Sequence, residues 1–138
     1  MLETYEQQTF IRLARNIINC EAFAHLEPKD RPVIFAVANG ARTSWTQAKK
    51  IKAEGVLKGV PDICFTYPNG KHHGLFIEMK RPKGEGGGAS PEQREIIANL
   101  QHYGYAVEVC RGWQEAERVL RDYISDGKKS LDKPQKVS

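Results

Sequence analysis

The chain has 138 residues and a mass of 15.6 kDa, a length that suits one domain built around one hydrophobic core. Hydrophobic residues at 40% and charged residues at 28% are typical of a soluble protein; no apolar run reaches the roughly 18 residues of a membrane span and no secretory signal pattern opens the chain, so we expect a cytoplasmic protein. The formal charge of +4 permits a polyanionic partner but does not require one.

An amphipathic helix is predicted from Glu3 to about Cys20, because its apolar residues recur at helical spacing. The same spiral, continued backwards, places Glu3 and Glu6 on or beside the apolar stripe. Acidic residues are also favoured in a first helical turn by the helix dipole. Both a structural and a functional interpretation of these glutamates therefore stay open.

A short buried strand is predicted from Val33 to Val37, followed by a polar turn that contains Arg42. A lysine-rich helix is expected from Thr46 to Glu54, ending at Gly55. Lysines near a helix C-terminus are ordinary dipole partners. Together with Arg42 and Lys58, however, they would bring positive charge to the segment that follows, and we favour a phosphate-tracking role for the cluster.

A hairpin is predicted between residues 62 and 80, with alternating apolar residues, a Pro-Asn-Gly turn and an apolar second strand. Glu78 and Lys80 are two residues apart and share one face of that strand. Asp62 opens the first strand directly after Pro61, which places its carboxylate opposite Glu78. The hairpin therefore predicts two carboxylates and a cation in one corner.

Two carboxylates suit a hard divalent ion, and Mg²⁺ (or Mn²⁺) fits best, with the carbonyl of Met79 as a third oxygen. The adjacent Lys80 would position a metal-bound water and offset charge on a phosphate. A Glu-Lys pair on a strand is often only a weak surface ion pair. Here the pair ends an apolar run, where an unpartnered charge is costly, and this favours a site.

The segment from Arg81 to Ser90 is predicted to be a loop, whose Arg81 and Lys83 would close over a DNA strand. Ser90-Pro91-Glu92-Gln93 is typical of a capped helix start, which gives Gln93 a structural role.

The helix that begins there should stop at Gly104 and lead into a strand from Tyr105 to Cys110, parallel to a neighbour. A last helix is expected from Gln114 to about Ser125, and residues 126–138 should form a basic, flexible tail. The cysteines have neither zinc nor disulfide spacing and are expected to be reduced core thiols: Cys20, Cys64 and Cys110.

Pro61-Asp62, fifteen intervening residues and then Glu78-Met79-Lys80 resemble the PD-(D/E)xK nuclease motif. The surrounding blocks resemble the VRR-NUC branch of that superfamily, over roughly residues 1–125: Asn39-Gly40 with Arg42, Gly55, Gly59-Val60-Pro61-Asp62, Ile77-Glu78-Met79-Lys80 and Ser90-Pro91-Glu92-Gln93. One departure is Ala38, where the family usually has proline.

The resemblance implies a restriction-endonuclease-like α/β fold, with a small mixed β-sheet flanked by helices, which the order of predicted elements also favours. It implies a Mg²⁺- or Mn²⁺-dependent DNA endonuclease with Asp62, Glu78, Met79 and Glu3 at the metal, Glu6 being the alternative to Glu3. Lys80 and Gln93 would position the attacking water, Arg42 would contact DNA, and no nucleotide cofactor is expected.

Stand-alone members of the resembled family occur in phages and bacteria and are implicated in cutting branched DNA. By analogy we expect a homodimer that resolves four-way (Holliday) junctions, since two symmetric cuts suit a two-fold dimer. The alternatives are a nuclease with flap, nick or restriction-type specificity, a catalytically silent DNA-binding protein of the same fold, and an RNA substrate, for which no stacking motif is visible.

Overall fold

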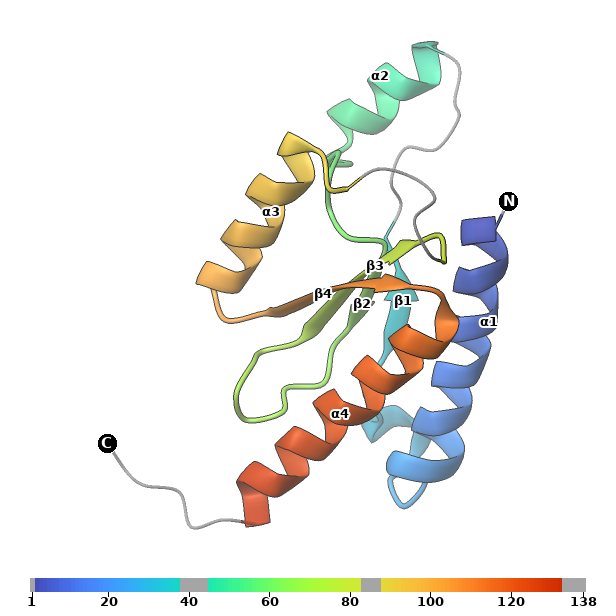
Figure 1. Cartoon of the computed structure of the whole chain (residues 1–138), viewed down its shortest axis with the longest axis vertical. Helices are drawn as coiled ribbons and strands as arrows, with labels where there is room; N and C mark the ends of the chain where they lie inside the picture. The colour runs from blue at the N-terminus through green and yellow to red at the C-terminus, as the bar shows by residue number, and fades with distance from the viewer. Residues whose placement is uncertain (1, 38–44, 83–87, 133–138) are drawn as a thin grey trace.

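Figure 1 shows the computed structural model of the chain, which describes residues 2–37, 45–82 and 88–132, with side chains described for 4–37, 46–82 and 88–126. Its elements are α1 (Leu2–Asn16), a π-helical turn (Ile17–Ala22), a 3₁₀ turn (Pro28–Asp30), β1 (Ile34–Ala36), α2 (Trp45–Ala53), β2 (Ile63–Phe65), β3 (Leu75–Lys80), α3 (Pro91–His102), β4 (Ala106–Arg111) and α4 (Trp113–Asp132). Among these helices, none is both long and apolar enough to cross a membrane.

The four strands of the described chain form one mixed sheet in the order β1-β2-β3-β4. β1 pairs antiparallel with β2 and β2 with β3, while β4 lies parallel to β3 after the α3 crossover. The predicted hairpin, crossover and mixed α/β fold are therefore confirmed. In the β2–β3 ladder Ile63 is opposite Ile77, so the residues one step outside this pair, Asp62 and Glu78, are opposite each other.

The hydrophobic core lies on the face of the sheet that α1 and α4 cover, as Figure 1 shows. Phe10 of α1, Ile77 of β3 and Leu120 of α4 are completely buried there. The opposite face is more open: α3 has no fully buried residue, and Phe35 and Val109 each keep 42% of their surface exposed. The acidic corner thus lies where a well-packed layer meets an open one.

The turn of the hairpin is fastened to α4 by Asn69, which is only 3% exposed. Its amide nitrogen donates to the carbonyl of Tyr123 at 3.0 Å, and its oxygen accepts from the backbone of Lys71 and His72. The Tyr123 hydroxyl in turn donates to the carbonyl of Tyr67 at 2.6 Å. Burial raises the pKa of that hydroxyl to about 12, which keeps it a donor. These bonds hold the end of the hairpin that lies away from Glu78.

The end of the last helix and the burial of one cysteine differ from the sequence-based expectation. α4 continues past Ser125 to Asp132, where a flexible tail was expected, and residues 133–138 lie outside the described part. Cys110 is buried and Cys64 partly buried, as expected, but Cys20 is exposed. The π-helical turn explains this, because its i→i+5 bonding shifts the residues after Ile18 around the helix axis, away from the core stripe.

Candidate active site

Asp62 and Glu78 are brought together at the open end of the β2–β3 ladder, as the sequence predicted. One oxygen of the Asp62 carboxylate accepts a hydrogen bond from the backbone N–H of Met79 at 2.8 Å. This bond continues the ladder one step beyond Ile63 with a side chain in place of a backbone carbonyl. The Asp62 carboxylate is therefore fixed against β3 next to Glu78.

Lys80 completes the corner, since its ammonium nitrogen lies 3.3 Å from Oε2 of Glu78. The two side chains share a face because strand residues alternate. Only 17% of the Lys80 side chain and 7% of the Glu78 side chain are exposed, so this pair is not a solvated surface ion pair.

Gln93 joins the corner from the first turn of α3. Its amide nitrogen donates to Oε2 of Glu78 at 2.9 Å, while its amide oxygen accepts from the backbone N–H of Ser90 at 3.0 Å. The backbone N–H of Gln93 donates to the Ser90 hydroxyl at 3.2 Å, which completes a capping box. The expected structural role is confirmed, and the same side chain also orients Glu78.

Gly59 allows α3 to approach the loop that leads to Asp62. Its φ of +97° is in the left-handed region, and a Cβ built on it would lie 3.0 Å from the backbone carbon of Glu92 and 3.2 Å from the backbone nitrogen of Gln93. Only glycine fits this contact. The glycine before Val60-Pro61-Asp62 is thus the reason that Gln93 reaches Glu78.

The electrostatics of the corner are dominated by Glu78. Burial, and next the negative charge of Asp62, raise its pKa from the ordinary 4.5 to about 7, against a smaller lowering effect of Lys80. Its Oε1 is buried and has no hydrogen-bond partner among the described residues. A buried carboxylate oxygen without a partner, beside a second carboxylate, is an arrangement that a hard cation would satisfy.

A third acidic ligand is not supplied by the side chains that the structure describes, where no cluster of three or more His, Cys, Asp or Glu residues forms. Glu3 lies in α1, but its side chain is outside the described set. Glu6 is 7% exposed and lies against Gly112, where one of its oxygens is buried without a described partner. Glu6 therefore does not line the groove that contains Asp62.

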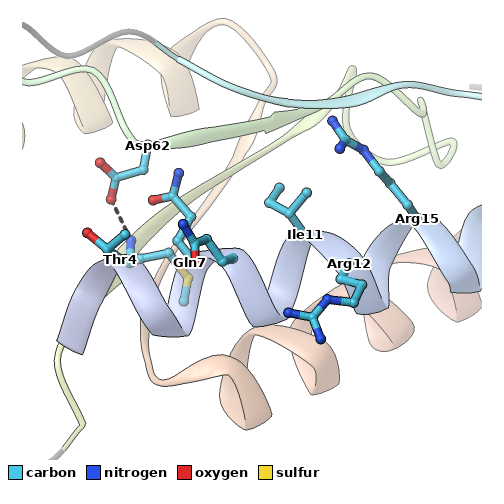
Figure 2. Close-up of a pocket in the computed structure, with 8 residues that line it drawn as sticks. Thr4, Gln7, Ile11, Arg12, Arg15 and Asp62 are labelled. Atoms are coloured by element: carbon cyan, nitrogen blue, oxygen red, sulfur yellow. Dashed lines mark hydrogen bonds between the residues drawn. The ribbon is translucent and has the colours of Figure 1, made fainter. Parts of the chain in front are cut away.

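That groove runs from Asp62 and Met79 along α1 and encloses about 860 Å³. Figure 2 shows Thr4 beside Asp62, with Arg12 and Arg15 further along the helix. The sequence interpretation missed this groove. Its signal was a set of polar and basic residues on one face of α1, and the residues from this helix that line it are Thr4, Gln7, Gln8, Ile11, Arg12 and Arg15.

The residues expected to contact DNA are only partly described. Lys58 and Arg81 are exposed, and Lys58 lies close enough to Glu92 to help lower the pKa of that carboxyl, after hydrogen bonds from its own backbone and from Ser90. Arg42 and Lys83 lie outside the described residues. The positive approach to the corner therefore stays a prediction.

A profile of the VRR-NUC domain matches residues 15–114, well over half of the chain. A solved structure of a "VRR_NUC domain protein" is 27% identical and superposes with a TM-score of 0.67 over 91% of this chain and 89% of its own. No curated protein matches the chain. From the extent of the profile match, the protein belongs to the VRR-NUC domain family, a family of nucleases with the restriction-endonuclease-like fold.

Proposed function

We propose that the protein is a metal-dependent endonuclease that hydrolyses phosphodiester bonds in DNA. The observation that carries this proposal is the corner itself. Asp62 and Glu78 are adjacent, Lys80 is 3.3 Å from Glu78, and one buried oxygen of Glu78 has no described hydrogen-bond partner. A structural ion pair would use both oxygens or expose them.

Asp62, Glu78 and the carbonyl of Met79 would hold Mg²⁺ or Mn²⁺, with Glu3 adding a carboxylate directly or through water. The N–H and C=O of one strand residue point to the same edge, so the Met79 carbonyl lies on the side where its N–H binds Asp62. Two carboxylates are sufficient for Mg²⁺, which retains waters and takes phosphate oxygens. Such an ion lowers the pKa of a bound water and polarises the phosphoryl group.

The neighbouring side chains have separate tasks in this proposal. Lys80 is a nearly buried cation beside the ligand carboxylates and would orient the attacking water and stabilise negative charge that develops on the phosphate. Gln93 would hold Glu78 in its binding orientation through its 2.9 Å hydrogen bond. Neither task requires a residue to move from its described position.

For the substrate we propose branched DNA, with four-way junctions resolved by a homodimer. A single compact active site cuts one strand, and junction resolution needs two cuts related by symmetry. The chain supplies one such corner, so two copies would supply the pair. This step rests on analogy with stand-alone VRR-NUC proteins and is the part of the proposal most in need of a direct test.

The decisive experiment is a cleavage panel with synthetic four-way, flap, nicked and linear DNA and a matched RNA, each incubated with Mg²⁺, Mn²⁺ or EDTA. Lys80→Ala should lower the cleavage rate about 100-fold or more while leaving junction binding intact. Lys71→Ala, which removes an exposed lysine at the opposite end of the hairpin, is the matched control and should cleave normally.

Retained cleavage by Lys80→Ala would refute the role of Lys80. Preferential cleavage of flap or nicked DNA would replace the junction assignment by that specificity. A wild-type protein that cuts nothing and binds neither metal in calorimetry would instead be the silent DNA-binding alternative. The dimer is tested separately by sedimentation, where a monomer at cleavage concentrations would contradict it.

A further inference from the structure

The groove along α1 begins at the acidic corner and is long enough to hold several nucleotides. Eleven residues separate Thr4, beside Asp62, from Arg15 at the other end, and at about 1.5 Å per residue this is roughly 16 Å of helix. Phosphates follow one another every 3.4 Å or so along the axis of a B-form strand. The groove therefore spans about five nucleotides.

Arg12 and Arg15 differ from the other arginines for which contacts are known. Arg31 donates to three backbone carbonyls, and Arg121 is paired with Glu21 and Glu117. Arg12 and Arg15 are exposed, and no hydrogen bond or ion pair joins either of them to any residue that the structure describes. Like charges one turn apart repel each other mildly, so this pair adds nothing to the helix itself.

The remaining lining of the groove also suits a phosphodiester backbone. Thr4, Gln7 and Gln8 place a hydroxyl and two amides between the corner and the arginines, and these groups donate to phosphate and sugar oxygens. Ile11 is the apolar residue in this stretch of α1 and offers a surface for a sugar or base. No carboxylate among the described lining residues lies beyond Asp62 to repel a polyanion.

We infer that the groove along α1 is the track of the DNA strand that is cut at the corner, with Arg12 and Arg15 contacting phosphates about three to five nucleotides from the scissile bond. The inference rests on the proposed nuclease function and adds to it the course of the substrate. It also assigns DNA contacts to the first helix, on the side of the corner away from Lys58 and α3.

The salt dependence of binding gives this inference a magnitude. Each phosphate contact contributes about 0.9 to the slope of log affinity against log salt on duplex DNA. Loss of two contacts should therefore make the decline in affinity between 50 and 200 mM salt about tenfold smaller than in the wild type, and about sevenfold smaller if the strand is single.

The test compares two double variants that remove the same charge with the same spacing. Arg12→Gln with Arg15→Gln removes the groove pair, and Arg118→Gln with Arg121→Gln removes a pair from α4. Binding of labelled junction, duplex and single-stranded DNA is measured by fluorescence anisotropy in EDTA, where no cleavage occurs, at several salt concentrations. Urea unfolding of each variant confirms that it is folded.

We expect weaker binding and a shallower salt slope for the groove variant only. Equal slopes for the two double variants would overturn the inference, because the effect would then be one of net charge. A photo-crosslinking residue at Gln8 provides a second readout, and it should label the cut strand within about five nucleotides of the cut. Labelling elsewhere, or none, would also overturn the inference.

These outcomes separate the groove from the nuclease function. A groove variant that binds and cleaves like the wild type, while Lys80→Ala is inactive, would refute the strand track and leave the nuclease standing. If the wild type cuts no DNA, the nuclease proposal fails, and the track of a cut strand fails with it. The two salt slopes would then still show whether the groove binds DNA at all.

Discussion

Replacement of Glu78 by Gln should stabilise the metal-free protein, and by an amount that grows with pH. Folding raises the pKa of this carboxyl from 4.5 to about 7, mainly through burial and the charge of Asp62. Between these values the folded state binds more protons than the unfolded state. The stability that protonated Glu78 contributes is therefore fully present below pH 4.5 and is lost as the pH rises through 7.

The magnitude follows from the two pKa values. Linkage gives a loss of about 1 kcal/mol at pH 5 and about 3 kcal/mol at pH 8, relative to a group that never ionises. The glutamine side chain of the variant would keep an acceptor oxygen for Lys80 and Gln93 but carries no charge. The free energy of unfolding of the variant, minus that of the wild type, should thus increase by about 2 kcal/mol from pH 5 to pH 8.

The assay is urea unfolding in EDTA at pH 5 and pH 8, where 2 kcal/mol corresponds to a change of about 1 M in the difference between midpoints. Glu108→Gln is the matched control, because it replaces an exposed glutamate on the neighbouring strand, and its effect should not change with pH. A difference between Glu78→Gln and wild type that is the same at both pH values, or that decreases towards pH 8, would refute the reasoning.

Three other substitutions test contacts that shape the site. Gln93→Glu retains the oxygen that caps α3 but turns a donor into a carboxylate beside Glu78, so cleavage should fall at least tenfold while helix content by circular dichroism stays unchanged; normal cleavage would contradict the orienting role. Gly59→Ala adds a Cβ 3.0 Å from the backbone of Glu92 at positive φ and should lower the unfolding free energy by about 2 kcal/mol, measured in urea; a neutral effect would mean that the loop yields freely. Asn69→Ala removes three hydrogen bonds from a buried turn and should destabilise by about 2 to 4 kcal/mol without altering metal binding at the distant corner, as calorimetry would show.

Local sequence signals predicted most of the framework of the corner. Alternation in β2 and β3 set the faces of Glu78 and Lys80, and Ser90 with Gln93 announced the start of α3. In each case the residues that carry the signal are close together along the chain. The physical causes, strand pleat and helix capping, act over only a few residues.

Features that depend on how distant elements pack could not be predicted in the same way. The bond from Gln93 to Glu78 requires α3 to approach Gly59, a contact between segments more than thirty residues apart. The groove exists only because α1 lies beside Asp62, so the polar face that contains Arg12 and Arg15 looked like an ordinary solvated surface. Cys20 was misplaced because a π-helical turn has no clear signal in composition or spacing.

The double task of Gln93 ties heat inactivation to the fraying of one helix. The side chain that closes the first turn of α3 is the one that holds Glu78 in place, so a thermal fluctuation that uncaps the helix also releases the carboxylate. Loss of activity on warming should then coincide with the melting of this turn and precede the collapse of the buried layer between α1 and α4. The catalytic lifetime of the protein would be set by its least protected helix, not by its core.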